Sequence, residues 1–205
     1  MKQLLSIILI VFSLSFSSAQ EAYLNIGRNF TTYDYTNLQG EQNSNIESSS
    51  GTSYEIGFSF PIAEKLSIDT GITLDQYNAT GGNYVNSYSW NTNYLGLQGM
   101  AKYTILNTEK FPLAIYLNGG INLNHIISGE QKINKQSYDL SKQDEFKGLY
   151  LRPIAGLGLQ YFLINNVSIS LTYNISKNFR LLRNADEQLD FTNHQLQFGV
   201  LMSLN

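Results

Sequence analysis

Apolar and polar residues alternate along most of the chain. Between residues 52 and 61, for example, Tyr54, Ile56, Phe58 and Phe60 occupy every second position, and polar or small residues fill the positions between them. Strict alternation is typical of β-strands, whereas an amphipathic helix repeats its apolar residues with a longer period. Eight segments show this alternation, with approximate limits at residues 22–34, 52–61, 66–77, 92–105, 113–127, 148–162, 166–177 and 192–204. The pattern therefore predicts an all-β protein of eight strands.

The lengths of the strands and of their connections indicate a membrane protein. Most strands have ten or more residues, whereas strands of soluble sheets have about five or six and tilted membrane strands roughly 9–11. Short connections at residues 62–65, 106–112 and 163–165 alternate with long polar ones at residues 35–51, 78–91, 128–147 and 178–191. In an up-and-down sheet all the long connections then lie at one end. This organisation predicts an eight-stranded antiparallel transmembrane β-barrel.

Alternation alone does not say which face of the sheet points inward, because a soluble barrel encloses its apolar face around a ligand. The polar face here consists mainly of Gly, Ser, Thr and Asn, which fit the narrow interior of an eight-stranded barrel. Charged residues make up 14% of the chain, compared with roughly 25% in soluble domains. We therefore expect the apolar face to contact lipid and the small polar residues to fill the lumen.

Aromatic residues at the ends of the apolar face support this orientation. Those expected at the short-turn end are Phe60, Tyr103 and Tyr161, and those expected at the long-loop end are Tyr54, Trp90 and Tyr173. Two such girdles mark the two interfaces of a membrane barrel. Tyr is also common in ordinary strands, so the girdles support the membrane interpretation without deciding it.

The N-terminus has the pattern of a secretory signal peptide. Lys2 precedes an apolar segment at residues 4–16, and small residues up to Ala19 provide a cleavage site. We expect residues 1–19 to be removed and residues 20–205 to form one domain. A retained helical anchor is disfavoured because the apolar segment is short, and a lipid anchor is disfavoured because the chain has no Cys.

Composition excludes several functional classes. The net charge of -3 argues against nucleic-acid binding, which requires a basic surface. The absence of Cys rules out disulfides and thiolate metal sites. The sequence contains no metal-ligand cluster, phosphate-binding loop or dinucleotide fingerprint. We therefore expect no metal site, no cofactor and no catalytic residues.

Five charged residues have the strand parity of the lumen: Glu55, Asp69, Asp75, Lys102 and Arg152. Buried charges require partners, so we predict an Asp69–Lys102 pair near the short-turn end. Glu55 and Arg152 are expected in a cluster toward the long loops, with Asp75 closer to the rim. These charges either fill the lumen structurally or, as the alternative, form an ion gate in a narrow conduit.

Arg28 is the exception among the charges, since it shares its parity with Leu24, Ile26 and Phe30 on the lipid-facing side. A charge at mid-depth there costs roughly 2–4 kcal/mol. Either a bulge near Gly27 turns Arg28 inward or its side chain extends to an interface, and we favour the bulge.

The two histidines are the candidate bases of a hydrolytic site. His125 precedes Ser128 and Glu130, and these groups could hydrolyse a lipid ester. The spacing of three residues, however, places His125 and Ser128 on opposite faces of a continuing strand. His194 has no Ser neighbour and is interpreted as a rim residue. A lipid-modifying enzyme is therefore the third hypothesis.

The closing segment QFGVLMSL resembles the β-signal by which outer-membrane barrels are recognised for insertion. Its elements are Gln197, Gly199, Met202 and Leu204, although aromatic residues usually fill the last apolar positions. Together with the eight strands, it makes the chain similar to small outer-membrane barrels of the OmpX and OmpA transmembrane-domain type, in the form common in the Bacteroidota, which belong to the wider porin family.

This resemblance implies a location in the outer membrane of a Gram-negative bacterium. The implied partners are outer-membrane lipids, the barrel-insertion machinery and an extracellular ligand at the four long loops. We expect a non-enzymatic protein with a structural or surface-binding role. A narrow channel for ions or small solutes is the alternative.

Overall fold

The computed structural model describes residues 21–36, 46–82, 87–107, 111–134, 136–143, 146, 148–164, 166–181 and 188–204. The signal peptide predicted at residues 1–19 lies outside these ranges and stays a prediction. Within them, no helix has both the length and the apolar character needed to span a membrane.

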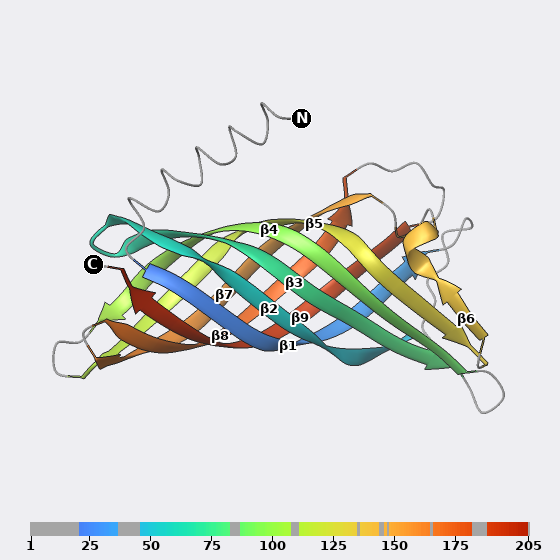
Figure 1. Ribbon diagram of the computed structural model, residues 1–205, viewed down its shortest axis with the longest axis horizontal. Coiled ribbons are helices and arrows are strands. Elements are labelled where there is room, and N and C mark those ends of the chain that lie inside the picture. The colour runs from blue at the N-terminus through green and yellow to red at the C-terminus, as the bar shows by residue number, and fades with distance from the viewer. Residues whose placement is uncertain are drawn as a thin grey trace.

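Eight long antiparallel strands close into a barrel (Figure 1). They are β1 (Glu21–Thr36), β2 (Ile46–Ala63), β3 (Leu66–Gly82), β4 (Ser87–Asn107), β5 (Leu113–Ile133), β7 (Leu149–Ile164), β8 (Val167–Arg180) and β9 (Gln188–Ser203). Each strand pairs with its neighbours in the chain, β1 pairs with β9, and the β4–β5 pairing completes the closure. The predicted fold class, an all-β barrel of eight antiparallel strands, is confirmed.

The pairing is staggered around the barrel. A row of paired residues that starts at Glu21 passes through Ser59, Asp69, Met100, Gly120, Ile154, Ser176 and Asn193 and returns to β1 at Thr31. The row climbs from position 21 to position 31, a stagger of ten residues. Such a stagger tilts the strands relative to the barrel axis, as Figure 1 shows.

The two faces of the barrel wall are oriented as the composition predicts. On β2, Ile56 is 61% exposed while the adjacent Glu55 is 4% exposed. On β9, Phe198 is 45% exposed and its neighbour Gln197 is 4% exposed. The apolar residues therefore form the outer wall, and the polar residues fill the lumen.

The strands extend further toward the long loops than the alternation predicts. β3 ends at Gly82 rather than residue 77, and β5 ends at Ile133 rather than residue 127. In these extensions polar residues lie on both faces, as in the Asn78–Asn91 pair. Backbone pairing continues there although apolar and polar residues no longer alternate. The strands are therefore longer, and the loops shorter, than predicted.

The bulge predicted at Gly27 is wrong. Successive residues of β1 pair without interruption, with Gly27 opposite Ser53 and Arg28 opposite Thr52. Arg28 is consequently exposed on the outer wall. It lies two residues beyond Ile26, the pairing partner of Tyr54, so it is close to the aromatic girdle of the long-loop end. Near an interface the cost of such a charge falls to about 0–1 kcal/mol.

The structure places most of the girdle residues on the outer wall. Tyr54, Tyr103, Tyr161 and Tyr173 are 42–50% exposed, and Phe60 is partly exposed. Trp90 is different, because it packs against buried residues inside the mouth of the barrel and stacks on Tyr88. The lipid-facing position predicted for Trp90 is wrong, since it shares its parity with the buried Thr92.

Candidate functional site

The long-loop end of the lumen is closed by a cluster of buried apolar and aromatic side chains, which we call the aromatic plug. Its members are Tyr33, Tyr77, Ala79, Tyr94, Ile126, Leu140, Phe146, Tyr150 and Phe191. Phe191 lies at its centre, with its ring centroid 4.8 Å from that of Tyr77 and 6.0 Å from that of Tyr150. Aromatic rings at such separations attract one another beyond simple burial.

The third long connection contributes to the plug. After β5 the chain forms the short strand β6 (Gln136–Asp139), which pairs with the end of β5, and then the 3-10 helix η1 (Leu140–Lys142). Asp139 caps η1 by accepting a hydrogen bond from the Ser141 N–H at 3.0 Å. Leu140 is fully buried, and Phe146 is 6% exposed. The connection predicted as a loop is therefore partly folded against the barrel mouth.

A buried ion pair lies in the lumen beside the plug. Arg152 Nη2 is 2.9 Å from Asp75 Oδ2, and each side chain is 1% exposed. Arg152 also donates to the Tyr77 hydroxyl, and its guanidinium lies 5.8 Å from the centre of the Tyr77 ring. Asn29 and Gln195 donate to the other oxygen of Asp75 at 3.3 and 3.2 Å. The ion pair thus crosses the lumen from β3 to β7 and is coupled to the plug.

Glu55 lies in the next layer and is surrounded by neutral donors. Tyr23 and Gln98 donate to one carboxylate oxygen at 2.8 and 2.7 Å. Asn25 and Gln197 donate to the other at 3.2 and 3.3 Å. Hydrogen bonds of this kind replace the water that a buried carboxylate loses.

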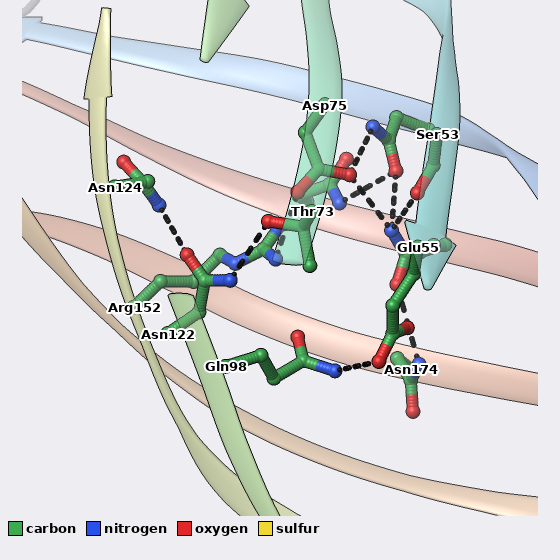
Figure 2. A network of polar contacts seen from close by, with 12 residues as sticks. Ser53, Glu55, Thr73, Asp75, Gln98, Asn122, Asn124, Arg152 and Asn174 are labelled. Carbon is green, nitrogen blue, oxygen red and sulfur yellow. Dashed lines mark hydrogen bonds and ion pairs between the residues drawn. The ribbon is translucent and has the colours of Figure 1, made fainter. Parts of the chain in front are cut away.

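Ser53, Glu55 and Asp75 lie in one network of polar contacts, as Figure 2 shows, and Gln195 connects Ser53 to Asp75. Gln195 Nε2 donates to Ser53 Oγ at 2.9 Å and lies 3.2 Å from Asp75 Oδ1. Gln197 reaches both Ser53 and Glu55. One polar network therefore fills the middle of the lumen.

The short-turn half of the lumen contains the remaining charges and a small cavity. Lys102 Nζ is 3.7 Å from Asp69 Oδ2, and Ser59 donates to Asp69 at 2.6 Å. The cavity, lined by these two charges together with Glu55 and Tyr116 among others, has a volume of about 40 Å³. That space holds only a few water molecules.

The predicted lumen charges thus all lie inside the barrel, but their pairing differs in part from the prediction. Asp69 is brought to Lys102 as predicted. Arg152 is paired with Asp75 rather than directly with Glu55, and Asp75 is fully buried rather than near the rim. Asp75 is deeper than predicted because β3 continues to Gly82.

The aromatic plug was not predicted from the sequence. Its signal was present in the strand parity, since Tyr77 shares its face with Asp75 and Tyr150 shares its face with Arg152. The sequence pattern predicts a face that is small and polar throughout. The structure shows that it changes from small polar residues to aromatic ones toward the long loops.

The predicted separation of His125 from Ser128 is also wrong. A bulge occurs in β5, because Tyr94 pairs with Ile126 while Asn93 pairs with Ser128. Because Ile127 is the extra residue of this bulge, the side chains of His125 and Ser128 both point to the outer face of the barrel. The two side chains nevertheless have different hydrogen-bond partners. His125 Nδ1 is 2.8 Å from the Gly148 carbonyl oxygen, whereas Ser128 accepts a hydrogen bond from Asn93 at 3.0 Å.

The residues of the predicted insertion signal divide between the two faces. Gln197 and Gly199 are buried in the lumen, and Met202 and Leu204 are 53% and 44% exposed on the outer wall. A Cβ atom at Gly199 would collide with the Asn25 and Ser170 side chains. The glycine therefore has a packing role in the lumen, independent of any role in recognition.

A second glycine gives a direct test of lumen packing. Gly158 lies opposite Tyr116, whose hydroxyl is 2.6 Å from Thr172 Oγ1, and a Cβ atom at Gly158 would overlap the Tyr116 ring. Gly158→Val should destabilise the barrel by about 1–3 kcal/mol through overpacking, measured by urea unfolding in lipid vesicles. The control is Gly119→Val, because Gly119 faces outward with no close contact. Equal stability of the two variants would contradict the assigned faces.

A closed barrel with an apolar outer wall and a polar, filled lumen defines an integral membrane β-barrel. The sequence matches the family model "Outer membrane protein beta-barrel domain" over residues 4–202. The chain therefore belongs to this family and is an outer-membrane protein of a Gram-negative bacterium.

Two solved structures show the same fold. The barrel is similar to Neisserial surface protein A, with 15% sequence identity, a TM-score of 0.50 and coverage of 89% of this chain and 97% of that one. It is also similar to OprG from Pseudomonas aeruginosa, with 11% identity, a TM-score of 0.52 and coverage of 91% and 97%. No curated protein matches the sequence.

Proposed function

We propose that the protein is a non-conducting, non-enzymatic outer-membrane barrel that acts through the surface at its long-loop end. The observation that carries this proposal is the filling of the lumen. The aromatic plug closes one end, and the Asp75–Arg152 pair crosses the barrel beside it. A solute would have to displace both, so transport is not the activity that this interior supports.

The alternatives receive less support. A narrow ion conduit would use the Asp69–Lys102 pair and the cavity around it, but that cavity does not extend through the plug. A lipid-ester hydrolase would need His125 to activate Ser128, yet His125 bonds to Gly148, just before β7, and Ser128 accepts a hydrogen bond from Asn93 on β4. The β6–η1 segment and the strand ends instead offer a folded polar surface on which an extracellular partner could bind.

The orientation of the barrel can be tested by single-cysteine labelling, because the natural chain contains no Cys. Lys132 is on the exposed end of β5, and Lys65 is in the turn between β2 and β3 at the opposite end. A membrane-impermeant maleimide should label Lys132→Cys in intact cells and Lys65→Cys only after the outer membrane is permeabilised. The reverse pattern would place the long loops in the periplasm and would remove the basis for a surface-binding role.

A further inference from the structure

Three basic side chains interrupt the apolar outer wall where β1, β9 and β8 run side by side. Arg28 and Lys177 are exposed there, and His194 is partly exposed between them. The lumen network described above does not contain these three residues. They therefore call for an explanation on the lipid-facing side of the barrel.

The register places these three residues on one diagonal of the sheet. His194 pairs with Phe30, two residues beyond Arg28 on β1. Lys177 pairs with Thr192, two residues beyond His194 in the same direction. Going from β1 through β9 to β8, a row of directly paired residues shifts toward the short-turn end because the strands are tilted. Each step from Arg28 to His194 to Lys177 moves two residues toward the long loops, which offsets that shift. The three side chains therefore lie at a similar depth in the membrane.

That depth corresponds to the outer part of the apolar band. Arg28 is seven residues along from Glu21, the first residue of β1. At about 3.3 Å per residue and a tilt of roughly 40°, it lies about 18 Å above the short-turn end, within a band about 25 Å tall. Long basic side chains at this level extend their charged groups to the lipid headgroups.

The chemistry of the three groups suits a phosphate. Arginine presents a planar set of donors that binds phosphate in a bidentate manner. The Tyr173 hydroxyl lies 2.6 Å from His194 Nδ1, so when it donates there, Nε2 carries a proton and can donate to an anion. Asp190, a carboxylate on the same face of β9, lies four residues nearer the loop end than His194.

Apolar depressions flank the basic residues. One surrounds Arg28 and is lined by side chains that include Ile26, Phe30, Leu171, Leu196 and Phe198. The other contains Lys177 and is lined by residues that include Pro153, Ala155, Ile175 and Phe179. If the phosphate of a lipid binds the basic residues, its hydrocarbon chains can fill these depressions. An isolated phosphate ion would not fill them.

We propose that Arg28, His194 and Lys177 bind the phosphate of an outer-leaflet lipid whose acyl chains occupy the two depressions. This site is independent of the proposed loop surface and requires no opening of the lumen. It also gives a reason for Arg28 to remain on the outer wall, because the phosphate supplies the hydrogen-bond acceptors that hydrocarbon lacks.

The test uses the complete barrel refolded in detergent and incubated with lipid A carrying one phosphate. Bound lipid is counted by native mass spectrometry. The wild-type protein should retain the lipid, and the double variant Arg28→Gln/Lys177→Gln should bind it about tenfold more weakly, since two charge-assisted contacts are lost. Lys65→Gln, at the short-turn end, is the matched control and should bind as the wild type does. Heat-modifiable gel migration confirms that each variant is folded.

Two further arms identify the source of the phosphate. The same lipid after enzymatic removal of its phosphate should bind about as weakly as the double variant binds the intact lipid. Inorganic phosphate at the same concentration should not displace the lipid. Equal binding by the wild type and the double variant, or equal binding of the two lipids, would overturn the site. Displacement by inorganic phosphate would overturn its assignment to a lipid.

Discussion

Replacing Arg152 by Met should lower the free energy of unfolding by about 3–5 kcal/mol, because Asp75 would then be buried without its cation. Both side chains are 1% exposed, so water cannot replace the lost partner. The measurement is urea unfolding in lipid vesicles. The fluorescence of Trp90 reports unfolding directly, since Trp90 is the single Trp of the chain and packs against the plug.

Two controls separate the ion pair from general damage to the lumen. The double variant Asp75→Leu/Arg152→Met removes both charges and should recover much of the lost stability. Lys102→Met should cost about 1 kcal/mol or less, because its pair with Asp69 is longer, at 3.7 Å, and less buried. If the double variant were as unstable as Arg152→Met, the unpaired Asp75 charge would not be the cause.

Replacing Phe191 by Ala should cost about 3–5 kcal/mol, because it leaves a cavity at the centre of the plug. The Phe191 ring contacts those of Tyr33, Tyr77, Tyr94 and Tyr150. These neighbours belong to four different strands of a closed barrel, which limits how far they can collapse into the space. The same unfolding experiment, followed through Trp90 fluorescence, measures the loss.

Phe198 provides the matched control on the same strand. It is 45% exposed on the outer wall, where lipid chains can fill the space left by truncation. Phe198→Ala should therefore destabilise the barrel clearly less than Phe191→Ala. A larger effect at Phe198 would mean that the plug contributes little to the stability of the barrel.

The barrel itself could be predicted from the sequence because its two faces meet different surroundings. The outer wall contacts lipid and the lumen is filled with polar side chains, so each strand alternates strictly, as Ile56 and Glu55 illustrate. The adjacent-strand pair Asp69–Lys102 could be predicted for the same reason, since strand direction alone brings the two residues together.

The contacts across the lumen could not be predicted in this way. Asp75 and Arg152 belong to strands that are not neighbours, and their meeting depends on the stagger of the whole barrel. The bulge in β5 that changes the face of Ser128 is a backbone irregularity without a sequence signature. The burial of Leu140 requires the third long connection to fold back over the mouth, which hydrophobic alternation does not encode.

The aromatic plug and the ion pair beside it close the lumen. Single-channel recording of the purified full-length protein in planar lipid bilayers tests this closure. The filled lumen predicts no steady conductance steps across the voltage range in which the bilayer itself is stable. Reproducible open-channel steps from the folded wild-type barrel would contradict it and would favour the narrow conduit.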